Sequence, residues 1–266
     1  MNQQALIEAI TLALADEPAI EALFLAGSYG RGTADAHSDV DLIALVAPED
    51  HAALGARWRT ILPAITPIVF WNEMNRGGLL LNAVSEDWLR CDLSMLAPAA
   101  FTRRARDTVK PLLDRHDVYA SLPATLPPQL PNPERVSYQI SEFIRVLGLL
   151  PVGIGRSEYV TGVTGVGLLR DLLVGLLIED VPLPDRGGAL HLSKLLPPGQ
   201  MAMLAALPYP KPDRAEVIAA NLALAHAFFP RARVLARRLN LTWPTAFEAA
   251  TRRHLGASLG MQTDWN

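Results

Sequence analysis

Cysteine is nearly absent from this chain, and that absence removes two classes of site. Cys91 is the single cysteine among 266 residues, so no intramolecular disulfide can form, which fits the reducing environment of the cytoplasm. Nor do the histidines and the cysteine gather with the spacing of a zinc site. We therefore expect a cytoplasmic protein held together by an ordinary hydrophobic core.

A strong excess of charge is also lacking. The chain has 24 Lys and Arg residues against 27 Asp and Glu residues, for a net charge of -3. Dedicated nucleic-acid binders usually carry a clear basic bias, so we do not expect a nucleic-acid partner. Half of the residues are hydrophobic, which is enough to bury a core. This composition suits a small-molecule enzyme.

Long uninterrupted hydrophobic runs are missing too. The most apolar stretch, residues 160–178, contains Arg170 and Asp171 near its middle, where a transmembrane helix rarely carries charge. The first 16 residues include Glu8 and Asp16 and lack a basic region and a cleavage site, so a signal peptide is not expected. We expect the apolar stretch to be a buried helix and the protein to have no membrane partner.

Hydrophobic periodicity in the first 120 residues predicts both helices and strands. Apolar residues at helical spacing predict helices, and short apolar runs bounded by turn residues predict strands. The expected helices are residues 3–15 and 49–62, and the expected strands are residues 20–26, 39–46, 65–71, 79–84, 88–96 and 109–113. This part should therefore be an α/β (α+β) domain with a mixed sheet.

The composition changes between residues 121 and 133, where five prolines hold the backbone extended. Beyond this stretch the patterns are helical only. The expected helices there are residues 134–150, 158–180, 213–239 and 244–255. We therefore expect a first domain at residues 1–120, a proline-rich linker at 121–133 and an all-α helical domain at 134–266.

Residues 27–42 carry the most informative chemistry. Side chains alternate along a strand, so Asp39 and Asp41 should point to the same side. Their neighbours Val40 and Leu42 are apolar, which places that side close to the interior. Two carboxylates held together repel each other unless a cation lies between them. Oxygen ligands at this spacing suit Mg²⁺.

The glycine-rich turn before these aspartates could hold phosphate. Gly27, Ser28 and Gly30 follow a predicted strand, and free backbone N–H groups in such a turn, together with a serine hydroxyl, can bind phosphate oxygens. Arg31 and Ser38 are further candidates for phosphate contact. For these two residues, a role in the turn itself is an equal alternative.

The two features together resemble a known signature. Gly27-Ser28 after a strand, with Ser-Asp-Val-Asp-Leu at residues 38–42 opening the next strand, resembles the DNA polymerase beta-like nucleotidyltransferases. The resemblance covers roughly the first 115 residues. It implies that Asp39 and Asp41 bind Mg²⁺ or Mn²⁺, and that the Gly-Ser turn holds the triphosphate of ATP or another nucleoside triphosphate.

The resemblance also implies a third carboxylate on a later strand. Asp92 fits, because its neighbours Cys91 and Leu93 would face the core and leave it on the polar face. Glu86 and Asp87 precede the strand and look like turn residues. Whether Asp92 would bind metal or accept the proton of the acceptor hydroxyl stays open.

The C-terminal half resembles, in size and architecture, the helical domain of the aminoglycoside and lincosamide nucleotidyltransferases. Residues 142–145 and 156–159 add to this similarity. It implies transfer of AMP from ATP to a hydroxyl of a small acceptor, such as a cationic antibiotic. Glu142, Glu158 and Asp171 are then candidate acceptor contacts or a second general base.

Three alternatives stay open from the sequence. The acceptor could be a protein or a tRNA, as for an antitoxin-like or regulatory nucleotidyltransferase, and the chain could be a non-catalytic member of the fold. The presence of Asp39, Asp41 and Asp92 together speaks against the non-catalytic alternative. The sequence leaves the oligomeric state open.

Overall fold

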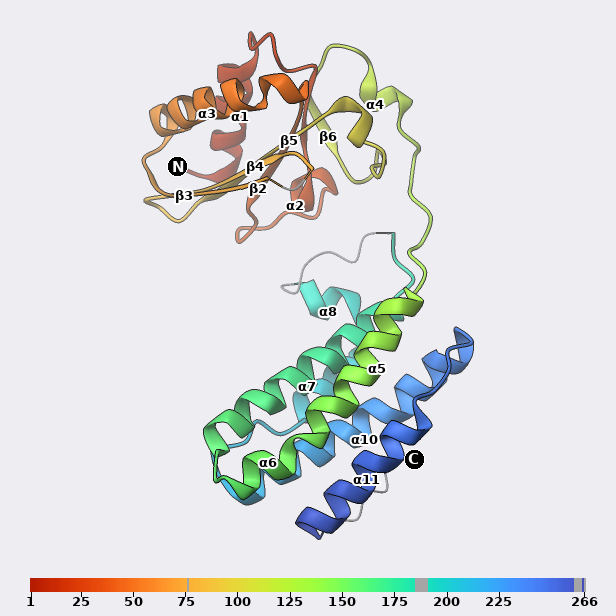
Figure 1. Cartoon of the computed structure of the whole chain (residues 1–266). Helices are drawn as coiled ribbons and strands as arrows, with labels where there is room; N and C mark the ends of the chain where they lie inside the picture. The colour runs from red at the N-terminus through yellow and green to blue at the C-terminus, as the bar shows by residue number, and fades with distance from the viewer. Residues whose placement is uncertain (76, 185–190, 261–264, 266) are drawn as a thin grey trace. The chain divides into compact units, whose positions relative to one another are not determined.

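The computed structural model describes every residue except 76, 185–190, 261–264 and 266. The chain divides into two compact units, Met1–Pro127 and Pro128–Asn266 (Figure 1). The boundary falls within the proline-rich stretch. Each unit has a hydrophobic core of its own.

The N-terminal unit combines a six-stranded sheet with short and medium helices. Its helical elements are α1 (Gln3–Leu14), α2 (Gly27–Gly30), η1 (Pro48–Asp50), α3 (His51–Ile65), η2 (Pro98–Ala100) and α4 (Val118–Ser121). Its strands are β1 (Ala22–Leu25), β2 (Val40–Leu45), β3 (Ile68–Asn75), β4 (Leu79–Ser85), β5 (Arg90–Leu96) and β6 (Lys110–Asp114).

The sheet is mixed, as predicted. Its strand order is β3-β4-β5-β2-β1-β6. The central pair β2–β5 is parallel, and the other four pairs are antiparallel. On β5 the buried residues Cys91, Leu93 and Met95 alternate with half-buried ones, so Asp92 lies on the opposite face of the sheet from this core.

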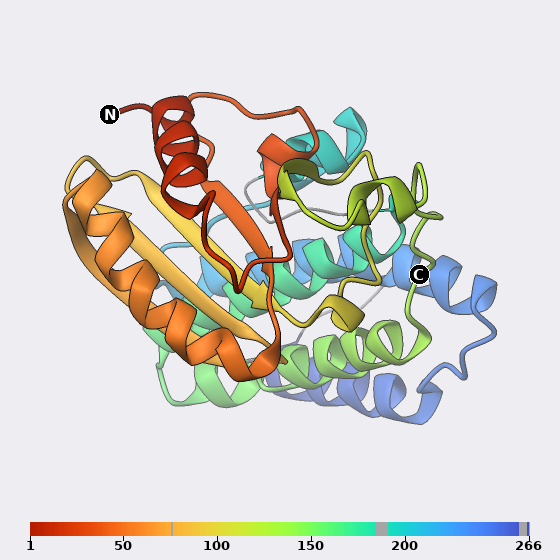
Figure 2. The same ribbon diagram turned by 90° about the horizontal axis from the view of Figure 1, so that it is seen from above.

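The helices α1 and α3 cover one face of the sheet (Figure 2). In α1 the buried residues Leu6, Ile10 and Leu14 recur at helical spacing. The Asn2 side chain caps the helix by accepting a hydrogen bond from the Ala5 N–H at 2.9 Å. The other sheet face carries a smaller hydrophobic cluster that includes Phe24, Ile43 and Leu45, and Asp41 is the half-buried residue of β2 beside it.

The C-terminal unit is helical throughout its described regular structure, as predicted. Its helices are α5 (Pro133–Gly148), α6 (Leu150–Gly155), α7 (Tyr159–Glu179), α8 (Leu192–Leu195), α9 (Pro198–Ala206), α10 (Arg214–Arg238) and α11 (Thr245–Leu259).

Aromatic rings fill the core of this bundle. Phe143 stacks on Phe228 with ring centroids 3.8 Å apart, and Phe229 stacks on Trp265 at 5.2 Å. Phe143 and Phe229 meet edge to face. These contacts fasten α5, α10 and the C-terminal residues to one another, because stacked and edge-to-face aromatic pairs add to the energy of burial.

The apolar helix α7 buries one face and not its whole surface. Leu169 and Leu173 are fully buried, whereas Val160 is 73% exposed and Leu168 is 51% exposed. By length and composition alone, α7 is the one described helix that could cross a membrane. Its buried face packs against α5 and α10.

The structure corrects several predicted boundaries. The predicted strand at residues 65–71 begins only at Ile68, because α3 continues through Pro63 to Ile65. The predicted strand at residues 39–46 begins at Val40, so Asp39 precedes it. The helices α6, α8 and α9 were not predicted, since each is too short to show a clear helical period.

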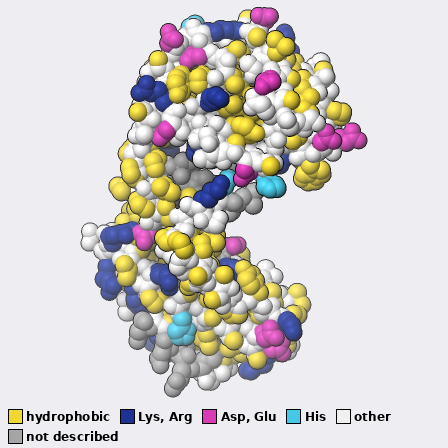
Figure 3. All heavy atoms as spheres, turned by 180° about the vertical axis from the view of Figure 1, so that it is seen from behind, with side chains coloured by type: hydrophobic (Ala, Val, Ile, Leu, Met, Phe, Trp, Pro, Cys, Tyr) yellow, Lys and Arg dark blue, Asp and Glu magenta, His cyan; other side chains and the backbone are white. Residues whose placement is uncertain are grey.

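Surface charge is mixed on both units. On the face drawn in Figure 3, acidic and basic side chains lie among hydrophobic ones on each unit. This agrees with the small net charge of the chain.

Glu248 joins the last two helices of the bundle. Its side chain is buried and accepts hydrogen bonds from Arg233, Arg252 and the indole N–H of Trp243. Burial alone would raise the pKa of Glu248, but the bonds from Trp243 and Arg252 and the charge of Arg233 hold this pKa below its usual range. The carboxylate therefore stabilises the bundle in its ionised form.

We predict that Glu248→Gln lowers the stability of the protein by at least about 2 kcal/mol, because it leaves two arginines without their anion. Thermal denaturation at pH 7 measures this loss, and Glu134→Gln, an exposed change on α5, should have a far smaller effect. In the wild type the same stabilisation should disappear as the pH falls below 4.5, the ordinary value for Glu. Equal melting temperatures for the two variants would contradict this role.

Candidate active site

A row of polar side chains crosses the open face of the sheet. The parallel register pairs Asp41 of β2 with Asp92 of β5. Asp92 is paired with Asn82 of β4, and Asn82 with Asn72 of β3. Paired residues on neighbouring strands point to the same face, so these four residues form one polar row.

Hydrogen bonds connect the row from its outer end. The Asn72 amide donates to Asn82 Oδ1 at 3.2 Å. Asn82 in turn bonds to the carboxylate of Asp92. The orientation of Asp92 is thus supported by two residues of the antiparallel strands.

Gly27 lies against Asp41 at the other end of the polar row. Its φ is +55°, and a Cβ atom at this position would lie 1.9 Å from Asp41 Oδ2. Only glycine meets both conditions, since other residues rarely adopt this backbone conformation and would also collide with the carboxylate. The start of α2 therefore lies directly against the Asp41 side chain.

The hydroxyl of Ser28 is buried beside this contact. Ser28 is 5% exposed, and its Oγ has no hydrogen-bond partner among the described residues. A buried hydroxyl without a partner is costly. The first N–H groups of a helix also have no partner within the helix, so the start of α2 offers donors of the kind that bind phosphate.

Gly30 has a packing role that the sequence did not predict, and Ser38 has the role in the turn that the sequence left as one of two alternatives. The Gly30 N–H donates to the Ala26 carbonyl at 2.8 Å, and a Cβ on Gly30 would lie 2.5 Å from the Thr108 carbonyl oxygen. The Ser38 hydroxyl bonds to Asp35 within the turn. Gly30 is therefore needed for close packing, and Ser38 for the turn.

The carboxylates of this site have excess negative charge. Burial, together with the charges of Asp39 and Asp92, raises the pKa of Asp41 to about 6 against the opposing charges of Arg31 and Arg90. Burial also raises the pKa of Asp92, against the hydrogen bond from Asn82. Such uncompensated charge is what a divalent cation with oxygen ligands would neutralise.

Asp39 departs from its predicted position. It precedes β2, and its carboxylate pairs with Arg90 at 3.4 Å. Within the described parts of the chain, no three His, Cys, Asp or Glu side chains gather as a metal site. Asp41 and Asp92 therefore form the centre of the site, and Asp39 lies near enough for its charge to act on both.

Sequence reasoning missed Arg90, Asn82 and Asn72. Arg90 neutralises part of the acidic charge, and the two asparagines support Asp92. Asn82 is a polar residue in the middle of an apolar strand, and this pattern could have indicated a role in the site. Its contact with Asp92 depends on the register of β4 against β5, which the sequence does not reveal.

The sequence comparison agrees with the fold and with this geometry. Residues 7–110 match the model of the nucleotidyltransferase domain family. These residues are a nucleotidyltransferase domain. The match includes both strands that carry the paired carboxylates and the Gly27-Ser28 turn. No curated protein matches the sequence.

Solved structures similar to the chain are distant from it in sequence. An aminoglycoside 6-adenyltransferase from Bacillus subtilis is 14% identical, with a TM-score of 0.43 over 95% of this chain and 96% of that one. A nucleotidyltransferase-like protein from Exiguobacterium sibiricum is 13% identical, with a TM-score of 0.38 over 96% and 88%. The GLD-2/RNP-8 complex is 14% identical, with a TM-score of 0.29 over 96% and 95%. Structural similarity at this low sequence identity does not identify the substrate.

We predict that Asp41→Asn stabilises the nucleotidyltransferase domain when no metal is present. The raised pKa means that the folded state holds a proton on Asp41 more firmly than the unfolded state does, so the ionised form costs stability once the pH exceeds about 6. Thermal denaturation in EDTA at pH 7.5 should show a rise in Tm of about 2–4 °C.

This gain should shrink toward zero near pH 4, where Asp41 is protonated in the folded wild type. Asp107→Asn, an exposed loop change, is the control and should leave Tm unchanged at both values of pH. A lower Tm for Asp41→Asn at pH 7.5 would show that the site is not electrostatically strained.

Proposed function

We propose that this protein transfers a nucleoside monophosphate, AMP from ATP, to a hydroxyl group of a small acceptor in a Mg²⁺- or Mn²⁺-dependent reaction. The observation that carries the proposal is the pairing of Asp41 with Asp92 directly beside the Gly27-Ser28 turn. A metal-binding pair of carboxylates thereby lies next to a group of phosphate-binding donors. The reaction is expected to occur in the cytoplasm.

The triphosphate would bind at the start of α2. The orphaned Ser28 hydroxyl and the first N–H groups of the helix would hold phosphate oxygens. Arg31, whose charge acts on Asp41, would add a cationic contact. Gly30 contributes close packing and not a donor, because its N–H is already bonded.

Asp39 and Asp41 would hold divalent metal ions together with the phosphates, and Asp92 would either complete a metal site or accept the proton of the acceptor hydroxyl. The bound ions would neutralise charge on the triphosphate and align the attacking oxygen with the α-phosphate. A carboxyl group whose pKa is raised is a better proton acceptor than an ordinary one, and the pKa of Asp92 is raised.

The reaction balances without a further reactant. The acceptor oxygen forms a bond to the α-phosphorus of ATP while the bond to the bridging oxygen breaks. Pyrophosphate leaves, and the hydroxyl proton passes to Asp92 or to water. The protein mainly has to position the reactants and neutralise their charge.

An acidic hollow in the helical unit supports a cationic acceptor. This hollow, defined here by Tyr138, Gln139, Glu142 and Asp171, lies between α5 and α7 and has a volume of about 350 Å³. Arg135 also lines it, and its charge is paired with Glu179. Gln139 is 7% exposed, and its Oε1 accepts no hydrogen bond from the described residues. An ammonium group could pair with a carboxylate of this hollow.

The two carboxylates of the acidic hollow are not equivalent. Glu142 accepts two hydrogen bonds from Arg145, at 2.6 and 2.7 Å, and these bonds lower the pKa of Glu142. Asp171 makes no ion pair with the described residues. Asp171 is therefore the stronger candidate for an acceptor cation.

We predict that Asp41→Asn lowers the rate of nucleotidyl transfer by at least about 100-fold, because the loss of one metal ligand costs several kcal/mol in the transition state. The assay supplies each of the four nucleoside triphosphates labelled at the α-phosphorus, with Mg²⁺ and a panel of aminoglycosides and lincosamides, and measures labelled acceptor. Asp107→Asn is the matched control. Full activity in Asp41→Asn would refute the metal role, and no labelled product from any pair would refute the proposed acceptors.

We further predict that Asp171→Asn raises the KM of a cationic acceptor by about 5-fold or more, whereas Glu142→Gln changes it less, because Glu142 is already paired. Steady-state kinetics at low and high salt measure both effects. Raised salt should raise the KM of the acceptor for the wild type and for Glu142→Gln, which keeps Asp171, but not for Asp171→Asn. If Asp171→Asn leaves the KM unchanged, the acceptor cation does not bind at this hollow.

A further inference from the structure

A second, apolar hollow lies at the end of α5 where the chain turns into α6. It is formed by α5, α6, α7 and α10 and has a volume of about 330 Å³. Its walls are mostly aliphatic. They include Val146, Leu149, Ile154, Leu168 and Val217. We call this the apolar hollow; it adjoins the acidic hollow, with which it shares Val146 and Leu168.

Two glycines in the walls of the apolar hollow have no packing reason to be glycine. A Cβ on Gly153 or on Gly165 would meet no heavy atom within 4 Å. By contrast, a Cβ on Gly162 would lie 2.9 Å from Val217, so Gly162 allows α7 to approach α10. Glycine inside a helix costs about 1 kcal/mol relative to alanine. At Gly153 and Gly165 this cost is not offset by close packing against the residues that the structure describes.

A buried polar group faces the same space. Asn221 of α10 lines the apolar hollow and is only 4% exposed. Its amide nitrogen donates to the Val217 carbonyl at 2.8 Å. Its carbonyl oxygen accepts no hydrogen bond from the described residues. The apolar hollow therefore contains one buried acceptor, to which a ligand could donate.

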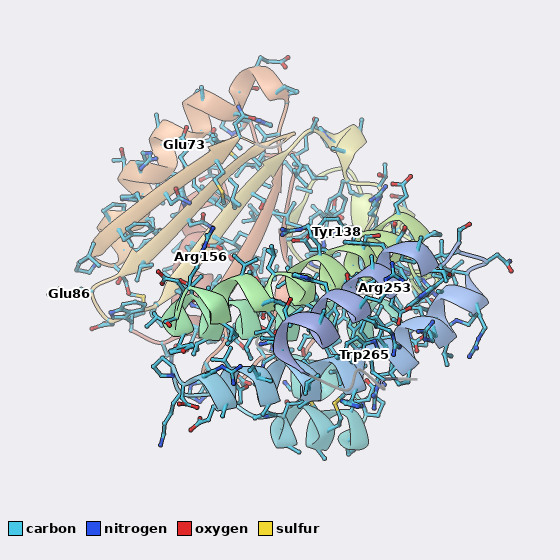
Figure 4. The ribbon with its side chains drawn as sticks, turned by 60° about the horizontal axis from the view of Figure 1, so that its bottom comes forward. Glu73, Glu86, Tyr138, Arg156, Arg253 and Trp265 are labelled. Carbon is cyan, nitrogen blue, oxygen red and sulfur yellow. The ribbon has the colours of Figure 1, made fainter. Side chains whose placement is uncertain are left out.

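Three charged side chains line the apolar hollow, and one of them, Arg145, is already paired with Glu142. Arg156, which lies after α6 (Figure 4), and Glu158, which precedes α7, both border the apolar hollow. Neither makes a side-chain ion pair with the described residues. Opposite charges at the rim favour a ligand without net charge, unlike the cation that the acidic hollow would take.

We infer that the apolar hollow is a binding site for a small, uncharged, largely apolar molecule that carries an N–H or O–H donor. The volume and the aliphatic walls are those of a small-molecule site. The open space at Gly153 and Gly165 would receive the apolar body, and the Asn221 oxygen would accept the donor. The inference concerns the helical unit alone and does not depend on the proposed transfer reaction.

N-phenyl-1-naphthylamine is a suitable probe, because it is uncharged and apolar, has one N–H donor and becomes fluorescent when buried. Titration of the full-length protein should show saturable binding of one equivalent. Gly165→Leu should weaken binding at least 10-fold by filling the hollow. Gly167→Leu is the matched control, since it adds the same side chain to the same helix at an exposed position with no neighbour within 4 Å, and it should bind like the wild type.

Asn221→Leu tests the polar contact. It should lower the affinity for the probe and leave the stoichiometry of binding unchanged. The affinity of this variant must fall without a fall in its Tm, and thermal denaturation measures that Tm. The inference would be overturned if the wild type showed no saturable binding of the probe, or if Gly165→Leu and Gly167→Leu weakened that binding equally. It would also be overturned if the wild type formed a dimer that Gly165→Leu dissociates, because the occupant would then be a second copy of the chain. Repeating the titration with Asp41→Asn separates this site from the proposed reaction, because binding should not change.

Discussion

The nucleotidyltransferase domain depends on one parallel strand pair in a sheet that is otherwise antiparallel. The pairing of β2 with β5 holds Asp41 beside Asp92 at the edge of the core. Burial raises the pKa of both carboxyl groups, and the charge of Asp39 raises both further. This electrostatic cost at two neighbouring residues is the physical reason for proposing a positively charged ligand at that place.

The surroundings of the two carboxylates follow from that constraint. Gly27 leaves room for the Asp41 side chain against the start of α2. Arg31 and Arg90 offset part of the charge, and Asn82 supports Asp92. The Gly27-Ser28 turn and the acidic pair thus share one corner of the sheet. This combination is the basis for proposing that a metal–nucleotide complex binds there.

The sequence predicts most of the fold and only part of the site. The mixed sheet and the helical C-terminal region are confirmed, because their hydrophobic periods are long and regular. The boundary of β2 was placed one residue early, since strand ends depend on pairing and not on composition. The pairing of Asp92 with Asn82 lay beyond prediction because it is set by register. The metal and acceptor roles stay proposals.

Binding of Mn²⁺ together with a nucleotide tests the central claim most directly. Electron paramagnetic resonance can titrate Mn²⁺ into the protein with and without an ATP analogue that carries a methylene group between the α- and β-phosphates. The account predicts that the analogue strengthens Mn²⁺ binding to the wild type by at least 10-fold, and that this gain disappears in Asp41→Asn. Equal Mn²⁺ binding by both proteins, with no effect of the analogue, would contradict it.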